Sequence, residues 1–287
     1  MEKMWQVIAW GAKELEQSGI VNAEFESSLL MRWLLNMDQK QLIFKKQVEL
    51  SEQETAQFHS IIQQRKTGYP LQYITSRQEF MGLEFMVTPD VLIPRWDTEV
   101  LIESILKKAL PENITAVDVG TGSGAIAISL ASFQKGWNIY ATDISEKALK
   151  IAGENAKNLG VEVIFLWGNL LEPIKSLPIK VHLIVSNPPY IPTEDIKSLM
   201  REVQHEPINA LDGGIAGLDY YSQLIPESFE LLENKGLIAL EIGIGQSSQI
   251  FEMCLNQGFS DIRLIEDYQG HPRVVLAQKN IHKGMIK

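Results

Sequence analysis

Residues 114–124 read ITAVDVGTGSG, an apolar run that passes through Asp118 and continues into a turn with glycine at every second position. The short apolar run predicts a buried strand. The three alternating glycines let the backbone turn sharply and come close to a ligand. The residues after Gly124 predict a helix, whose first N–H groups have no partner within the helix. A strand, a turn suited to ligand binding and a helix are therefore expected in direct succession.

The same order of strand and helix continues through the C-terminal two thirds of the chain. The expected strands are residues 114–119, 137–143, 161–166, 181–186, 236–243, 261–267 and 272–278, and the expected helices are 124–134, 145–158, 219–233 and 246–257. Such alternation predicts an α/β protein with a doubly wound, mostly parallel sheet of seven strands. Ligands of such sheets bind beyond the carboxyl ends of the strands, so the residues directly after each strand are candidates for the site.

The N-terminal residues differ from the rest and predict a small helical bundle over residues 1–75. Ser51 with Glu54 three residues later forms a capping box at the start of one helix. No reactive set of side chains stands out there, and we expect this domain to dock a substrate, because helices of this size need something to pack on. Residues 76–96 are expected to form a hairpin linker, and residues 97–287 the domain that carries the chemistry.

Composition narrows the classes of function. The 287 residues include 26 Lys and Arg against 36 Asp and Glu, a formal charge of −10, and the N-terminal region is not basic either. This charge balance argues against a protein whose main function is to bind the phosphate backbone of a nucleic acid. Cys254 is the one cysteine, which excludes an intrachain disulfide, and the isolated histidines predict no metal site. Without a leader pattern or an apolar run long enough for a membrane span, we expect a cytoplasmic protein without membrane or stable nucleic-acid partners.

The glycine turn and Asp143 together predict a nucleoside-cofactor site. Asp143 ends the second strand, at the distance from Gly124 where an acidic residue accepts hydrogen bonds from ribose hydroxyls. The spacing G-x-G-x-G after an aspartate differs from the G-x-G-x-x-G of dinucleotide sites and resembles the loop of methyltransferases that bind S-adenosylmethionine. By this resemblance Asp143 holds the ribose, and the methionine part is held by Asp118, Gly120, Thr121, Gly122, Ser123 and Gly124. A tight turn without a ligand is the alternative.

The fourth strand ends in Asn187-Pro188-Pro189-Tyr190, which predicts methyl transfer to a planar nitrogen. The Asn187 side-chain oxygen and the Pro188 carbonyl can each accept one N–H of an NH₂ group, and the prolines fix the backbone. Tyr190 can lie against the planar group. Alignment of this kind needs no histidine base. We therefore expect Asn187, Pro188 and Tyr190 to be catalytic and the whole tetrapeptide to bind substrate; a plain proline-rich loop is the alternative.

The tetrapeptide resembles the motif of methyltransferases that modify exocyclic nitrogens of adenine, guanine or glutamine. With the helical N-terminus, the 92–99 segment, the glycine loop, the 206–214 stretch and the 267–274 tail, the chain resembles the release factor glutamine methyltransferase family over nearly its whole length. The resemblance implies a class I methyltransferase fold with S-adenosylmethionine as cofactor. It also implies N5-methylation of the glutamine in the Gly-Gly-Gln motif of class I peptide chain release factors, which act in translation termination.

Three positions depart from the family pattern. Trp96 replaces a second proline, Ala216 replaces a common aspartate, and Asn169 stands where an acidic residue is common. By the resemblance Asn169 and Leu170 face the adenine, and an amide oxygen can still accept from the adenine amino group. Asn187 is also expected to border the cofactor.

Two other classes of function are alternatives to a protein methyltransferase. A DNA or RNA exocyclic-amino methyltransferase would use the same tetrapeptide, but the acidic composition disfavours it. A non-enzymatic binding module would not need the aimed amide acceptor of Asn187.

The polar residues from Arg95 to Glu99 and at Glu241 have two interpretations each. Arg95, Asp97 and Glu99 form a polar cluster, or Asp97 or Thr98 caps the next helix while Arg95 pairs with a carboxylate. Glu241 ends a strand, where it lines the site or only caps the next turn.

Overall fold

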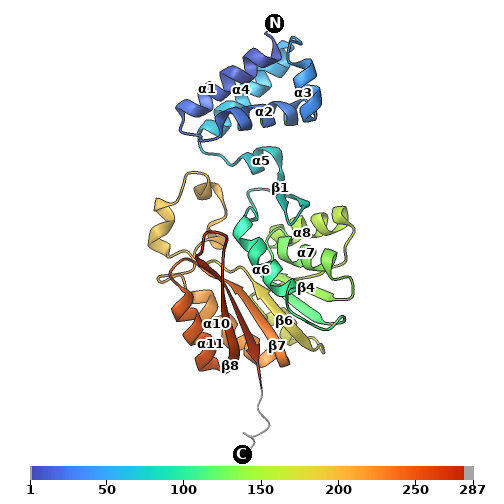
Figure 1. Ribbon diagram of the computed structural model, residues 1–287, viewed down its shortest axis with the longest axis vertical. Helices are drawn as coiled ribbons and strands as arrows, with labels where there is room; N and C mark the ends of the chain where they lie inside the picture. Colours follow the sequence, from blue (N-terminus) through green and yellow to red (C-terminus); the bar gives the residue numbers. More distant parts are fainter. Residues whose placement is uncertain (1, 281–287) are drawn as a thin grey trace, which may run out of the picture. The chain divides into compact units, whose positions relative to one another are not determined.

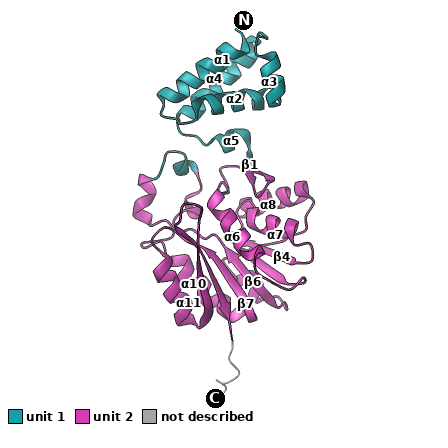
Figure 2. Ribbon diagram, in the orientation of Figure 1, with its two compact units in different colours: residues 1–77, 199–205 teal, residues 78–198, 206–287 magenta. Residues whose placement is uncertain are grey.

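The computed structural model describes residues 2–280 of the chain and divides into two compact units. We call residues 1–77 with 199–205 the helical unit and residues 78–198 with 206–287 the sheet unit (Figure 2). Residues 281–287, at the end of the domain predicted to carry the chemistry, lie outside the described residues.

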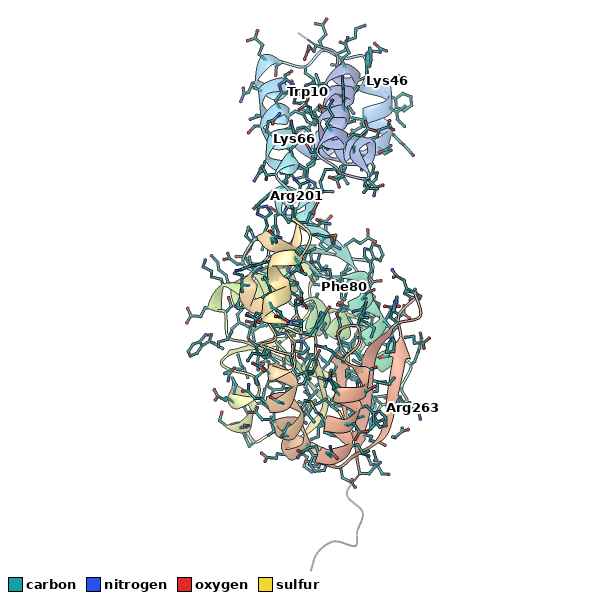
Figure 3. All side chains as sticks on the ribbon, turned by 90° about the vertical axis from the view of Figure 1, so that its left-hand side faces the viewer. Trp10, Lys46, Lys66, Phe80, Arg201 and Arg263 are labelled. Atoms are coloured by element: carbon teal, nitrogen blue, oxygen red, sulfur yellow. The ribbon has the colours of Figure 1, made fainter. Side chains whose placement is uncertain are left out.

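The helical unit contains the bundle of helices that the sequence predicts over residues 1–75. They are α1 (Met4–Gln17), α2 (Ala23–Leu34), α3 (Gln39–Lys45), α4 (Glu52–Lys66) and α5 (Leu71–Thr75) (Figure 1). The capping box at the start of α4 is confirmed, because Ser51 Oγ accepts from Glu54 N at 3.2 Å and Glu54 Oε2 accepts from Ser51 N at 2.8 Å. Trp10, labelled in Figure 3, packs against His59 of α4, and their ring centroids are 3.9 Å apart.

A short segment from the second half of the sequence, residues 199–205, belongs to the helical unit. Buried Arg65 pairs with Glu26 on α2 at 2.6 Å and with Glu202 of this segment at 3.2 Å. Arg201 donates to the Ser18 carbonyl at 2.7 Å. The guanidinium of Arg65 is thus satisfied by two carboxylates, which makes the segment part of the bundle.

The sheet unit has the seven-stranded, mostly parallel sheet predicted from the sequence. Its order is β5 (Ile164–Trp167), β4 (Asn138–Asp143), β3 (Thr115–Val119), β6 (Val181–Ser186), β7 (Leu232–Glu241), β9 (Pro272–Lys279) and β8 (Phe259–Glu266). The first five are mutually parallel, and β9 runs antiparallel to both of its neighbours. The chain leaves β3 toward β4 on one side and reaches β6 on the other, so the order reverses at β3.

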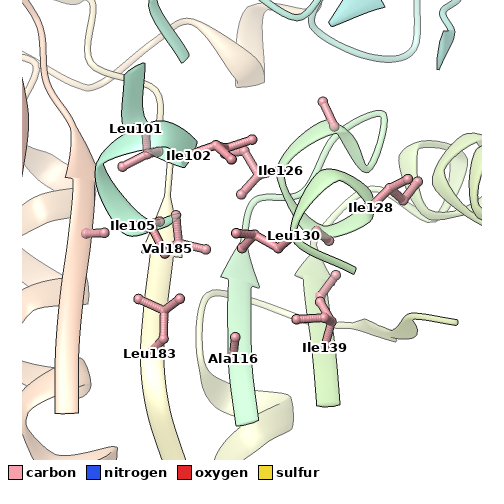
Figure 4. Close-up of a cluster of buried hydrophobic side chains, with 14 of the residues drawn as sticks. Leu101, Ile102, Ile105, Ala116, Ile126, Ile128, Leu130, Ile139, Leu183 and Val185 are labelled. Atoms are coloured by element: carbon pink, nitrogen blue, oxygen red, sulfur yellow. The ribbon is translucent and has the colours of Figure 1, made fainter. Parts of the chain in front are cut away.

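Helices cover both faces of this sheet. They are α6 (Trp96–Leu106), α7 (Ala125–Phe133), α8 (Glu146–Leu159), α9 (Glu172–Lys175), α10 (Asp219–Leu231) and α11 (Ser247–Gln257). Ala116 and Leu183 belong to one buried cluster with residues of α6, α7 and α8, shown in Figure 4. Their neighbours Val117 and Ile184 belong to a second cluster, with residues of α9, α10 and α11. Successive residues of a strand point to opposite faces, so each strand supplies both cores.

The predicted hairpin is present as β1 (Arg77–Phe80) and β2 (Leu83–Met86). Its turn places Met81 at φ 53° and Gly82 at φ 72°. Positive φ at both central residues is the geometry of a tight hairpin turn. The Met81 N–H donates to Glu99 Oε1 at 2.6 Å, which ties the turn to α6.

Among residues 2–280, no helix combines the length and apolarity that crossing a bilayer requires.

Gly11 of α1 lies against side chains of α2 and α4 and provides a test of the packing of the helical unit. A Cβ at Gly11 would lie 2.7 Å from Ser27 Oγ and 2.8 Å from Phe58 Cε1. We expect Gly11→Ala to lower the free energy of unfolding by about 1–3 kcal/mol through overpacking, measured by urea denaturation followed by far-UV circular dichroism. The matched control is Gly153→Ala in α8, where a Cβ meets nothing within 4 Å. It should raise stability by about 0.5–1 kcal/mol through helix propensity. A Gly11→Ala protein as stable as this control would contradict the packing.

Candidate active site

A cleft opens at the carboxyl ends of β3, β4 and β6, where the strand order reverses. Its empty volume, which includes space open to solvent, is about 750 Å³. The residues that line it after these strands, and after β5, include Gly120, Gly122, Asp143, Asn169, Leu170, Asn187, Pro188 and Pro189. The structure therefore brings together residues from all four strand ends that the sequence singled out.

The glycine loop forms an open cradle on one side of this cleft. Gly120 and Gly122 have φ of 73° and 56°, which disfavours residues with a side chain. A Cβ at either position would meet no atom within 4 Å, so their backbone faces open space. At Gly124, by contrast, a Cβ would lie 2.7 Å from Ile128 Cδ1 and 3.1 Å from Ala152 Cβ. The first two glycines leave room for a ligand, and the third lets α7 pack closely.

Asp118 lies beneath this loop, and no part of it lines the cleft. Its Oδ2 accepts from Thr121 Oγ1 at 2.6 Å and from the Ala127 N–H at 3.2 Å. Its Oδ1 has no hydrogen-bond partner within residues 2–280. Burial raises the pKa of Asp118 to about 7. Like Asp118, Thr121, Ser123 and Gly124 are absent from the lining of the cleft; these four residues shape the loop from below.

Asp143 lines the cleft and also holds the glycine loop. Its Oδ2 accepts from the Gly122 N–H at 2.8 Å, and its Oδ1 accepts from the Ser145 N–H at 2.8 Å. Each carboxylate oxygen has a second lone pair, which can accept from a ligand. Burial raises the pKa of Asp143, and hydrogen bonds from these backbone amides act in the opposite direction.

Asn169 and Leu170 form the wall next to Asp143. Leu170 has φ 46°, a left-handed conformation that is unusual for a residue with a side chain. Its carbonyl accepts from Thr142 Oγ1 at 2.8 Å, a bond that fixes the turn after β5 to the end of β4. The turn is therefore held in place by β4, and both residues border the cleft.

The tetrapeptide after β6 divides into residues that face the cleft and one that does not. Asn187, Pro188 and Pro189 line the cleft. The Asn187 Nδ2 donates to Thr98 Oγ1 at 3.1 Å. The Tyr190 hydroxyl donates to Glu241 Oε1 at 3.3 Å, and its ring packs against the second core. Burial raises the pKa of Tyr190, and the residue anchors the tetrapeptide from below.

Further lining residues come from outside the strand ends that the sequence analysis used. They are Asp90, Val91, Leu92, Pro207, Asn209, Ala210 and Tyr220. Glu206, almost fully buried, accepts from the Ile93 N–H at 3.2 Å and from Arg95. This carboxylate joins the 90–95 and 206–210 segments. Residues 92–95 and 206–210 belong to the family pattern quoted above, which was the available signal for them; Asp90 and Val91 lie outside that pattern.

The expected pairing of Arg95 with a carboxylate is confirmed by its bond to Glu206. The expected cap by Asp97 or Thr98 is wrong, because α6 already begins at Trp96 and has no side-chain cap. Asp97 pairs with Arg273 at 3.3 Å instead. Glu241 neither lines the cleft nor caps a turn, since it is buried and bonded to Thr98.

Comparison with known proteins assigns the chain to a family. The model of the PrmC N-terminal domain matches residues 6–75, and that of the methyltransferase small domain matches residues 96–215. The release factor glutamine methyltransferase of Moorella thermoacetica is 41% identical over 278 residues, which cover 96% of this chain and 98% of that protein. The enzyme of the same name from Bacillus subtilis is 35% identical and covers 99% of this chain and 100% of its own.

The chain belongs to the release factor glutamine methyltransferase family. The family resemblance drawn from the sequence is thereby confirmed. Solved structures share the fold at lower identity. A methyltransferase from Pyrococcus furiosus has a TM-score of 0.54 at 21% identity and covers 70% of this chain and 91% of its own. The hMettl16 catalytic domain in complex with MAT2A 3'UTR hairpin 1 has a TM-score of 0.57 at 16% identity. The match covers 88% of this chain and 92% of that chain.

S-adenosylmethionine is the cofactor that membership in a methyltransferase family implies, and the cleft fits it. The open backbone at Gly120 and Gly122 leaves room for the methionine part. Asp143 offers acceptors for a ribose diol, and Asn169 with Leu170 offers a polar group beside an apolar one for the adenine.

Asp143 provides the test of this cofactor site. We expect Asp143→Ala to raise the Kd for S-adenosylmethionine by about tenfold or more, because it removes charged acceptors and releases the Gly122 N–H. Isothermal titration calorimetry measures the constant. Glu146→Ala, which removes an exposed carboxylate at the start of α8, should leave the Kd unchanged. Equal Kd values for the two variants would count against the assignment.

Proposed function

We propose that this chain methylates the side-chain amide nitrogen of the glutamine in the Gly-Gly-Gln motif of class I peptide chain release factors. The observation that carries the proposal is the position of Asn187. Its amide nitrogen is bonded to Thr98, which leaves Oδ1 as an acceptor on a residue that lines the cofactor cleft. We further propose that the reaction takes place in the cytoplasm, together with its protein substrate.

The chemistry that these residues must perform is alignment of a weak nucleophile. An amide nitrogen shares its lone pair with the carbonyl, so it reacts only when it is held along the line of displacement. Asn187 Oδ1 and the Pro188 carbonyl would each accept one N–H of the glutamine NH₂ group. Bound S-adenosylmethionine supplies an electrophilic methyl group on a sulfonium. With the amide held in this way, the N–C bond would form as the S–C bond broke, and the nitrogen would lose one proton to solvent.

Asn187→Ala tests the alignment. The variant should lower kcat by about 10²- to 10³-fold, because one of two fixed acceptors is lost, while the Kd for S-adenosylmethionine stays within about twofold of the wild type. The assay uses labelled S-adenosylmethionine with a release factor, and mass spectrometry locates the methyl group. The exposed Asn138→Ala variant is the matched control and should keep full activity.

Three substrate arms accompany this experiment. A release factor with its motif Gln→Ala should take up no methyl group from the wild-type enzyme. Duplex DNA and RNA should take up none either. Methylation of a nucleic acid but not of the release factor would replace the proposal by an exocyclic-amino methyltransferase.

We also propose that the helical unit docks the release factor. A groove between α1, α2 and α3 is lined by exposed apolar side chains, including Val21 at 94%, Phe25 at 63% and Ile43 at 56% exposure. Exposed apolar patches of this kind mark sites of protein association. The described helical unit carries no side chain that lines the cofactor cleft. A docking role accounts for its apolar surface.

Phe25→Ser tests this docking surface. Loss of the exposed ring should raise KM for the intact release factor by about tenfold and leave kcat unchanged. Activity on a short peptide that contains Gly-Gly-Gln should not change, because such a peptide lacks the parts of the release factor that the groove would bind. Phe133→Ser removes a similarly exposed ring, 47% accessible, from the sheet unit and serves as the control. Equal KM values for both variants and the wild type would refute docking at this groove.

A further inference from the structure

A chain of hydrogen bonds runs from Asn187 into the core. Asn187 Nδ2 donates to Thr98 Oγ1 at 3.1 Å, and Thr98 Oγ1 donates to Glu241 Oε2 at 2.6 Å. The Tyr190 hydroxyl reaches the other oxygen, Glu241 Oε1, at 3.3 Å. Thr98 is 4% exposed and Glu241 is fully buried. The chain therefore links α6, the end of β7 and both ends of the tetrapeptide out of reach of water.

The chemistry of these groups fixes the direction of every bond. An ionised carboxylate only accepts, so the single proton of the Thr98 hydroxyl points to Glu241. The Thr98 oxygen must then accept, and the one group that it meets from the tetrapeptide is the Asn187 side chain. Asn187 satisfies it with its NH₂ end. The oxygen end of the amide is consequently left for the cleft.

Without such a partner the two ends of an asparagine amide are nearly interchangeable, because they have the same shape. A rotated Asn187 would present NH₂ to the cleft. An NH₂ donor facing the NH₂ of a substrate amide cannot hold it, since neither group accepts. The orientation of one amide thus separates a productive site from an unproductive one.

We propose that Thr98 and Glu241 are positioning residues, which hold the Asn187 amide with its oxygen toward the substrate. The inference rests on the proposed function for its kinetic consequence. Its structural content, the orientation of one amide, does not depend on which substrate is methylated.

The surroundings of Glu241 make this arrangement sensitive to pH. Thr98 and Asp97 face it from α6, Tyr190 from the tetrapeptide, Tyr221 from α10 and Arg273 from β9. Burial raises the pKa of Glu241 to about 7, against the opposing effects of the Thr98 hydrogen bond and the Arg273 charge. A protonated Glu241 can donate to Thr98, whose own proton then turns to Asn187 and favours the rotated amide. Turnover should therefore fall as pH drops through neutrality.

Kinetics on Thr98 variants provide the first test. Thr98→Val keeps the shape of the side chain and removes the hydroxyl, so kcat should fall by about 10- to 100-fold, with the Kd for S-adenosylmethionine within about twofold of the wild type. Thr98→Ser restores the hydroxyl and should restore most of kcat. Ser104→Ala is the matched control, because it removes another buried hydroxyl from α6, one that donates to the Leu101 carbonyl at 2.7 Å. Wild-type kcat in Thr98→Val, or failure of Thr98→Ser to restore it, would overturn the proposal.

The second test follows the amide itself and needs no substrate. In ¹⁵N-labelled enzyme, the side-chain NH₂ signals of Asn187 are identified by their loss in Asn187→Ala. We expect them to shift with a midpoint near pH 7, as Glu241 titrates, and to lose this titration in Glu241→Gln. The acid limb of the kcat profile should disappear in the same variant. A titration that persists in Glu241→Gln would assign it to another group, such as Asp118, and overturn the proposal.

The two tests separate this inference from the proposed function. If the wild-type enzyme methylates no release factor while the Asn187 signals follow Glu241, the proposed function fails and the positioning chain stands. If the enzyme methylates its substrate and Thr98→Val does not slow it, the positioning role fails and the proposed function stands.

Discussion

The pairing of β3 with a parallel neighbour on each side is the constraint on which the site depends. Val119 lies opposite Thr142 of β4 and opposite Ser186 of β6. The residues that follow these three positions are the glycine loop, Asp143 and Asn187, so they meet at one edge of the sheet although they are distant in the sequence. A shift of one residue in either register would also exchange the side chains that the strand supplies to the two cores. The two apolar cores that fix the register therefore fix the geometry of the site.

A second constraint comes from polar groups that the fold buries beneath the site. Burial of a carboxylate is costly unless its oxygens are satisfied. Both carboxylate oxygens of Glu241 accept, one from Thr98 and one from Tyr190, and the Arg273 charge stabilises the ionised form. One oxygen of Asp118 accepts from Thr121 and Ala127, while the other has no partner within residues 2–280. The fixed donors and acceptors of such networks give the side chains above them one orientation. These buried carboxylates therefore set the orientation of polar side chains that lie between the core and the cleft.

The chain passes between the two units three times, after residues 77, 198 and 205. Residues 199–205 belong to the helical unit through Arg65, Arg201 and their partners. The chain continues directly into Glu206, which binds the 93–95 segment, and into Pro207, Asn209 and Ala210, which line the cleft. The proposed docking unit and one wall of the cofactor cleft are thus neighbours along the chain.

The sequence by itself determined the order of strands and helices, the cap at Ser51, the cradle at Gly120 and Gly122 and the positions of Asp143 and Asn187, because each depends on local periodicity or local backbone conformation. It also determined the family, through motifs spread over the whole chain. Only the tertiary structure decided that Tyr190 turns inward, that Thr98 serves Glu241 instead of capping α6, and that residues 199–205 join the helical unit. These outcomes depend on contacts between groups that are far apart in the sequence. Strand register and helix packing set such contacts, and they produce no periodic pattern in the sequence from which they could be predicted.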